Sequence, residues 1–157
     1  MSEHELFMRA AIQLAEEGLK AGAGGPFGAV VVKNGIIVGR GWNQVTSMND
    51  PTAHAEVMAI RDACSKLGSF QLDDCEIYTS CEPCPMCLGA IYWARPNKVY
   101  YACTHNDAAK AGFDDSFIYK QMALHPGQRR IPATELLRTE SLLIFKKWAE
   151  KSDKVKY

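Results

Sequence analysis

The prediction of the fold starts from the stretch Cys81-Glu82-Pro83-Cys84-Pro85-Met86-Cys87. Upstream of it lies the motif His54-Ala55-Glu56. The two prolines of the first stretch bracket the start of a helix, because proline is tolerated at a first helical position. That places Cys84 at the helix N-cap and Cys87 one turn further on. Together with His54 they offer an imidazole and two thiolates, which are good zinc ligands. Three protein ligands leave the fourth tetrahedral position to water, so the pattern predicts a catalytic metal site.

Glu56 lies two residues after the predicted histidine ligand, and the spacing H-x-E followed by P-C-x-x-C is the signature of zinc-dependent deaminases. Asp50-Pro51 predicts an N-cap and a first-turn proline, so we expect a helix from there to Gly68. Because residues two apart on a helix diverge, His54 and Glu56 can share one site only if the metal lies off the helix end. Zinc lowers the pKa of bound water to about 7. We expect Glu56 to carry protons from this water to the substrate and its departing amine.

Alternating strand and helix patterns surround this site. Asn34-Gly35 joins two apolar runs and is a strong hairpin signal, while Ser2 and Glu5 form a capping box that starts the first helix. Strands alternating with helices predict an α/β fold, a three-layer α/β/α sandwich, in which the hairpin makes the sheet mixed. The 157 residues contain no linker or repeat and are expected to form one domain. We expect strands over 27–33, 36–42, 75–80 and 98–103, and further helices over 85–94, 116–122 and 139–151.

Cys81 offers an alternative in which four protein ligands close the metal site and leave no room for water. The chain would then be a zinc-stabilised domain without catalysis. Two observations disfavour this alternative: Cys81 precedes a Glu-Pro kink at a strand end, and a closed site would leave Glu56 without a role. We therefore expect Cys81 to be a buried structural thiol, and the same is expected of Cys64, Cys75 and Cys103.

The charge balance restricts the partners of the chain. Lysine plus arginine and aspartate plus glutamate number 18 each, so the chain lacks the positive field that binding to a phosphate backbone usually needs. We therefore expect no nucleic-acid partner, and we interpret the C-terminal lysines as a solvated helix face. His4, His105 and His125 are expected to be surface histidines outside the site.

The sequence also predicts the cellular compartment. No apolar run approaches the roughly 20 residues that span a bilayer, and the N-terminus is acidic where a signal peptide would be basic. Six cysteines without an export signal favour a reducing compartment. We expect a cytoplasmic protein without membrane association.

Three longer stretches, residues 50–56, 79–96 and 111–117, resemble the small bacterial guanine deaminases of the cytidine/deoxycytidylate deaminase family. The resemblance covers nearly the whole chain and is weakest over residues 123–145. It implies a central mixed sheet of five strands, one Zn²⁺ per subunit, and hydrolysis of the purine base guanine to xanthine and ammonia. The zinc motif alone leaves other substrates open: ammeline, a guanine nucleoside, cytosine, or adenosine in tRNA.

The same resemblance implies which residues contact the base. Asp115 would hold the 2-amino group and assist proton transfer, and Asn43 would hydrogen-bond the base. Phe27 and Trp93 would pack against its faces, and Ala55 would also contact it. From the residues alone, Phe27 and Trp93 can equally be core aromatics.

The resemblance further implies a homodimer. In this family the C-terminal segment, here about residues 140–157, crosses to the partner subunit. Its last residue, Tyr157, would help to close the active site.

Overall fold

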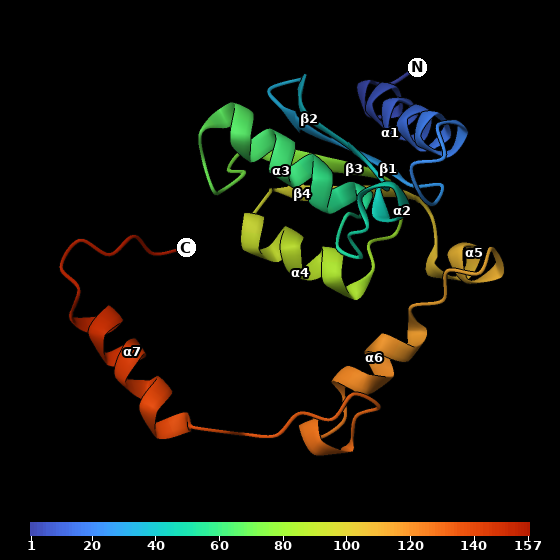
Figure 1. Cartoon of the computed structure of the whole chain (residues 1–157). Helices are drawn as coiled ribbons and strands as arrows, with labels where there is room; N and C mark the ends of the chain where they lie inside the picture. The colour runs from blue at the N-terminus through green and yellow to red at the C-terminus, as the bar shows by residue number, and fades with distance from the viewer. The chain divides into compact units, whose positions relative to one another are not determined.

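Four strands form the central sheet in the order β2-β1-β3-β4 (Figure 1). β1 (Gly28–Lys33) and β2 (Ile36–Trp42) form an antiparallel hairpin, and β3 (Cys75–Cys81) pairs antiparallel with the other edge of β1. β4 (Lys98–Cys103) pairs parallel with β3. Asn34 and Gly35 at the hairpin turn both have positive φ, 50° and 74°, as the sequence predicts for this turn type. The sheet is therefore mixed, as expected.

Helices cover both faces of the sheet. α1 (Glu3–Lys20) packs on one face, while α3 (Ala55–Leu67) and α4 (Pro85–Ala94) lie on the other (Figure 1). Successive side chains of a strand point to opposite faces. Accordingly, Val30 is buried in the cluster beneath α1 and Val31 in the cluster beneath α3 and α4. This arrangement confirms the three-layer α/β/α prediction.

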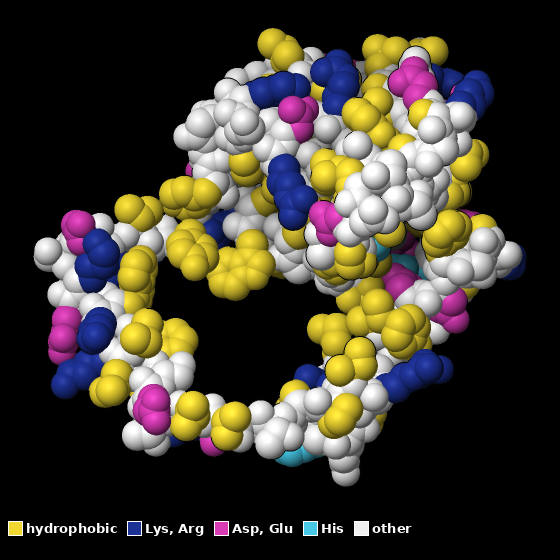
Figure 2. Space-filling model, in the orientation of Figure 1, with side chains coloured by type: hydrophobic (Ala, Val, Ile, Leu, Met, Phe, Trp, Pro, Cys, Tyr) yellow, Lys and Arg dark blue, Asp and Glu magenta, His cyan; other side chains and the backbone are white.

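The computed structural model describes all 157 residues, which divide into two units, Met1–Asp115 and Ser116–Tyr157. The first unit holds the sheet. The second contains α6 (Ser116–Met122), a 3-10 turn (Pro126–Gln128) and α7 (Arg138–Glu150), and none of its residues is buried. Hydrophobic and basic side chains lie together on its surface (Figure 2). No helix in either unit combines the length and apolar character needed to cross a bilayer.

The expected fifth strand is absent, so that prediction is wrong. After β4 the chain turns directly into α5 (His105–Lys110), which Thr104 starts through a reciprocal capping box with Asp107. The remaining chain carries turn formers and helix caps rather than an alternating apolar run, and it contributes no ladder to the sheet. β4 is therefore an edge strand, and Cys103, expected to be buried, is exposed.

Two glycines of β2 allow α3 to lie very close to the sheet. An ideal Cβ at Gly41 would lie 2.2 Å from the carbonyl oxygen of Ala55 and 2.4 Å from the backbone nitrogen of Ala59. At Gly39 it would lie 2.5 Å from the carbonyl oxygen of Ala59. These glycines therefore set the distance between β2 and the first turns of α3.

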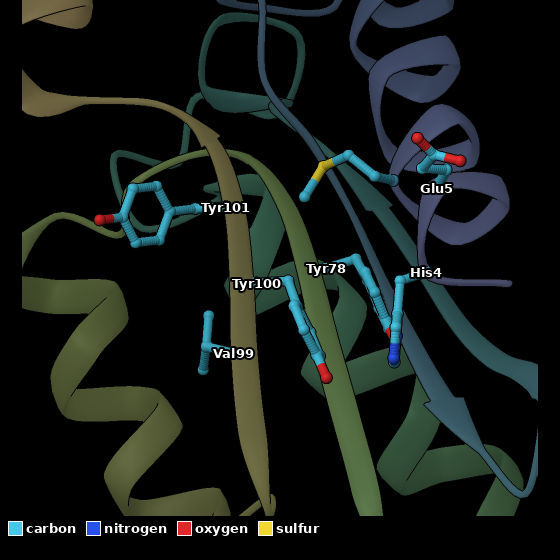
Figure 3. A pocket seen from close by; sticks show the side chains of 7 residues that line it. His4, Glu5, Tyr78, Val99, Tyr100 and Tyr101 are labelled. Carbon is cyan, nitrogen blue, oxygen red and sulfur yellow. The ribbon is translucent and has the colours of Figure 1, made fainter. Parts of the chain in front are cut away.

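An aromatic stack fastens α1 to the sheet on the face opposite α3. The rings of Tyr78 and Tyr100 stack with centroids 4.7 Å apart, and His4 stacks on Tyr100 at the same distance (Figure 3). The Tyr78 hydroxyl donates to Glu76 at 2.7 Å, and burial, followed by this bond, raises the pKa of Tyr78. The stack lines an open pocket of about 370 Å³, separate from the predicted metal ligands.

Candidate metal centre and active site

The start of α3 differs from the sequence prediction in a way that shapes the site. The helix begins at Ala55, and His54 is its N-cap with extended backbone (φ −74°, ψ 154°). The predicted start at Asp50-Pro51 is wrong, because Asp50 Oδ1 instead accepts the backbone N–H of Thr52 at 2.8 Å and its hydroxyl at 2.7 Å. These bonds close a turn that competes with helix. The ring of His54 therefore belongs to the helix entrance, and Glu56 lies in the first turn.

The start of α4 agrees with the sequence prediction. Cys84 is the N-cap, Pro85 occupies the first helical position, and the backbone N–H of Cys87 donates to Cys84 Sγ at 3.5 Å. Both sulfurs thus lie at a helix N-terminus, where the partial positive charge of the backbone favours thiolate.

The two helix entrances bring one imidazole and two sulfurs together. His54 Nδ1 lies 3.5 Å from Cys84 Sγ and 3.5 Å from Cys87 Sγ, and the three ligand atoms all lie within 4.8 Å of one another. Typical zinc bonds of about 2.0 Å to nitrogen and 2.3 Å to sulfur, at tetrahedral angles, separate N and S by about 3.5 Å. The observed distances match this value, so the His/Cys/Cys cluster fits one zinc ion.

Hydrogen bonds within the cluster shift the pKa values of its three side chains in different directions. A hydrogen bond with Cys87, and further ones from His54 and the backbone, lower the pKa of Cys84 to about 4 against the opposing effect of burial. The same bond with Cys84, together with burial, raises the pKa of Cys87. A hydrogen bond to Cys84 raises the pKa of His54. These shifts favour the thiolate form at Cys84, and binding of a zinc ion would displace the proton of the Cys87 thiol.

Glu56 lies beside this cluster and is only 6% exposed. Its Oε2 lies 3.4 Å from Cys87 Sγ, and its Oε1 accepts from the hydroxyl of Thr79 at 3.2 Å. Burial is the main reason that the pKa of Glu56 is raised. A carboxyl group with a raised pKa is suited to taking up and releasing a proton near neutral pH.

Thr79 is a site residue that sequence reasoning missed. It is 1% exposed on β3 and occupies the same face of the strand as Cys75 and Ile77, which belong to the cluster beneath α3. The alternation of β3 could have placed it on that face, but no motif connects it with Glu56.

Cys81 does not join the metal cluster. Its Sγ points instead toward the carbonyl oxygen of Thr104, at 3.7 Å, and burial raises the pKa of its thiol to about 11. The cluster therefore consists of three donors, and Cys81 is a buried thiol, as the sequence predicts.

Asn43 is buried and held in one orientation. Its Oδ1 accepts the backbone N–H groups of Gly25 at 3.2 Å and Val45 at 3.1 Å. These bonds fix the amide plane and leave the NH₂ group to donate to a ligand. A Cβ at Gly24 would lie 2.1 Å from the same Oδ1, so the glycine is needed for this arrangement.

The aromatic residues do not all behave as expected. Phe27 is half-buried and meets Phe113 edge to face, with ring centroids 5.0 Å apart and planes at 86°. A Cβ at Gly25 would lie 3.1 Å from the first ring and 3.2 Å from the second. Sequence reasoning assigned no role to Phe113. Trp93 is 64% exposed on α4 and is therefore not a core aromatic.

Three further residues were predicted to contact the base or close the site: Ala55 and Asp115 in the first unit and Tyr157 in the second. Ala55 is fully buried at the first position of α3. Asp115 lies at the end of the first unit, with Oδ2 3.4 Å from Nδ1 of His105, a histidine that sequence reasoning left outside the site. Tyr157 belongs to the second unit.

Comparison with known proteins gives a consistent family. Residues 1–103 match the model of the cytidine and deoxycytidylate deaminase zinc-binding region. The chain is 60% identical over 154 residues to the guanine deaminase of Bacillus subtilis (strain 168), across 98% of this chain and 99% of the relative. The X-ray structure of guanine deaminase from Bacillus subtilis superposes with a TM-score of 0.96 at 59% identity and covers 100% of this chain and 99% of that one.

A second group of relatives matches a shorter part. The tRNA-specific adenosine deaminase of Aquifex aeolicus (strain VF5) is 40% identical over 98 residues, which is 62% of this chain and 64% of the relative. The chain therefore belongs to the cytidine and deoxycytidylate deaminase family of zinc-binding proteins.

Proposed function

We propose that this chain hydrolyses guanine to xanthine and ammonia. The observation that carries the proposal is the extent of the similarity: the relative named guanine deaminase aligns with 98% of the chain, whereas the tRNA-specific relative aligns with 62%. The relative named guanine deaminase therefore also shares the part of the chain that the tRNA-specific relative leaves unaligned. In the reaction, water adds its oxygen to C2 of guanine, the bond from C2 to the amino nitrogen breaks, and ammonia leaves.

We assign His54, Cys84 and Cys87 as the ligands of one zinc ion per subunit. The support is their mutual spacing of 3.5 Å between nitrogen and sulfur and their position at two helix entrances. When bound, zinc supplies a water molecule activated as a nucleophile near neutral pH.

Glu56 is the proton carrier in this proposal. Its Oε2 faces the metal ligands beside Cys87, while the hydroxyl of Thr79 holds Oε1 and thereby the orientation of the carboxyl group. It accepts a proton from the attacking water and passes it to a ring nitrogen; it then takes the remaining proton of the added hydroxyl group and passes it to the departing amine. The raised pKa favours the protonated state from which both transfers to the substrate take place.

The substrate contacts are assigned on geometry and family resemblance. The NH₂ group of Asn43 donates to the base, and Phe27, supported by Phe113, packs against one of its faces. Ala55 begins α3, so its backbone N–H has no partner within the helix and can face the ligand. Trp93 covers the base from α4, and Asp115 holds the 2-amino group.

We further propose a homodimer of single deaminase domains, in which residues 140–157 are exchanged and Tyr157 closes the partner's site. The distribution of charge along the chain supports this exchange. Ser116–Tyr157 carries nine of the 18 lysines and arginines but four of the 18 aspartates and glutamates, which gives +5 there and −5 in Met1–Asp115. The second unit also buries none of its own residues. A cytoplasmic location fits the six unpaired thiols, because thiolate ligands need reducing conditions.

One observation favours a second candidate, deamination of adenosine in tRNA. The net charge of +5 in the second unit would suit a phosphate backbone, and a relative named tRNA-specific adenosine deaminase is 40% identical over 98 residues. This function predicts a steep fall in activity with salt.

Ammonia release by the purified, zinc-loaded protein tests both functions. The substrates to compare are guanine, guanosine, ammeline, cytosine, adenine and a tRNA anticodon stem. Guanine is expected to lead by at least about tenfold in kcat/KM, a difference of about 1.4 kcal/mol. A tRNA stem that leads at low salt would support the second function, and a lead by any other base would refute the guanine assignment.

A further inference from the structure

His105 lies between two carboxylates and has no part in the proposed reaction so far. Its Nδ1 is 3.4 Å from Asp115 Oδ2, and its Nε2 is 3.3 Å from Glu82 Oε1. The side chain is 33% exposed, and that of Asp115 is 18% exposed. Each ring nitrogen of His105 thus faces one of the two carboxylates.

Glu82 braces this histidine against the end of β3. Its Oε2 accepts the backbone N–H of His105 at 3.0 Å, while its own backbone N–H donates to the carbonyl oxygen of Cys103 at 2.8 Å. The same glutamate stands two residues before Cys84. His105 is thus tied, through one side chain, to the backbone that leads into the metal ligands.

Asp115 lies at the end of the loop that follows α5. It follows a turn in which Gly112 has a φ of 95°, and the loop is fastened by Phe113 against Phe27. The contact with His105 engages Oδ2 of the carboxylate. Oδ1 is the oxygen that we assign to the substrate.

We propose that His105, braced by Glu82, is a positioning residue that holds Asp115 in the orientation needed to bind the amino group of the substrate. The inference rests on the proposed function, in which Asp115 contacts guanine. His105 connects the end of β3, which leads into the metal ligands, with the loop that carries Asp115.

Two matched substitutions test the proposal, because each keeps one of the two nitrogens. The amide nitrogen of asparagine replaces Nδ1, which faces Asp115, and that of glutamine replaces Nε2, which faces Glu82. We expect kcat on guanine to fall about 10- to 100-fold in His105→Gln and His105→Ala, as for a misplaced catalytic group. In His105→Asn we expect it to stay within about threefold of wild type. A role in stability alone predicts the reverse order, since glutamine would keep the brace to Glu82.

Zinc content and Tm are measured for each variant, so that loss of folding is separated from loss of positioning. His4→Asn, on the opposite face of the sheet, is the control and should leave kcat unchanged. Asp115→Asn is made alone and combined with His105→Ala. If His105 acts through Asp115, the double variant has the kcat of Asp115→Asn within about twofold.

The outcomes separate the two proposals. If Asp115→Asn keeps normal kcat on guanine, the assignment of Asp115 fails, and the positioning role fails with it. If Asp115→Asn lowers kcat but His105→Ala has normal kcat, only the role of His105 is overturned. The same holds if His105→Ala lowers kcat as much in the Asp115→Asn background as it does in the wild type. If His105→Asn is as impaired as His105→Ala, despite normal zinc content and Tm, the role of His105 is also overturned.

Discussion

The substitution Gly41→Ala tests whether the close approach of β2 and α3 places the metal ligands. The added Cβ would lie 2.2 Å from the carbonyl oxygen of Ala55, about 1.2 Å short of the 3.4 Å at which ordinary contact begins. The obstacle is backbone rather than a flexible side chain, so either β2 or the start of α3 has to move by about 1 Å. His54 precedes Ala55 directly and would move with it, whereas Cys84 and Cys87 on α4 would not.

The expected losses of stability, zinc affinity and catalytic rate follow from this displacement. Overpacking of this kind costs roughly 1–3 kcal/mol of stability. Zinc ligands tolerate shifts of about 0.2 Å, so zinc affinity should fall as well. A misplacement of about 1 Å at the reacting centre costs on the order of 10²-fold in rate. The measurements are the free energy of unfolding in urea, zinc content after dialysis, and kcat on guanine.

Gly89→Ala is the matched control, because it makes the same change in α4 at a position where a Cβ meets nothing within 4 Å. Replacing an exposed helical glycine with alanine should raise stability by about 0.5–1 kcal/mol and leave kcat unchanged. If Gly41→Ala unfolds at the same urea concentration as wild type and keeps full zinc and activity, the argument that these glycines position α3 is refuted.

Four further predictions concern the site and the thiols. Glu56→Gln should retain zinc but lose about 10²- to 10⁴-fold in kcat; a near-normal kcat would remove Glu56 from the mechanism. Cys81→Ser should keep one zinc per chain, and loss of the metal from this folded variant would revive the four-ligand site. In thiol labelling of the zinc-loaded protein at pH 8, the exposed Cys103 should react first and the buried Cys81 slowly. A pKa of about 11 leaves roughly 0.1% of the Cys81 thiol ionised at this pH. Faster labelling of Cys81 than of Cys103, located by mass spectrometry, would contradict the burial of Cys81. Truncation after Lys151 removes Tyr157 and should raise KM or lower kcat on guanine, whereas unchanged kinetics would exclude the tyrosine from the site.

The raised pKa of Cys81 also predicts a pH dependence of stability. In the unfolded chain a thiol ionises near pH 8.5, whereas in the fold burial holds its pKa at about 11. The stabilising effect of keeping the thiol protonated is complete below pH 8.5 and is lost as pH rises toward 11. The free energy of unfolding of the wild type should therefore fall more steeply over this range than that of Cys81→Ala; equal slopes would contradict the prediction.

Local signals in the sequence predicted much of the fold. The start of α4 was predicted correctly because a proline and an N-capping residue act within one turn. The hairpin followed from Asn34-Gly35 for the same reason. The start of α3 was predicted wrongly because Asp50 has two local uses, a helix cap or a turn, and its bonds to Thr52 selected the turn.

Residues recruited by tertiary structure could not be found in this way. The metal cluster was predictable because H-x-E and P-C-x-x-C are short motifs with fixed chemistry. Thr79, Phe113 and His105 have no such motif, and each enters the site only when a strand or loop passes beside a residue distant in sequence. The fifth strand was expected from resemblance alone, and the residues after Cys103 do not have the pattern of a strand.

The order of these parts along the chain has a consequence for synthesis. All three metal donors precede Lys98, and the last strand is complete at Cys103. Because chains emerge from the ribosome with the N-terminal part first, the three metal donors are synthesised before the loop with Asp115 and the segment that ends in Tyr157. Asp115 and Tyr157, two of the residues proposed to contact the base, are thus added last, to a nascent chain that already contains its three metal donors.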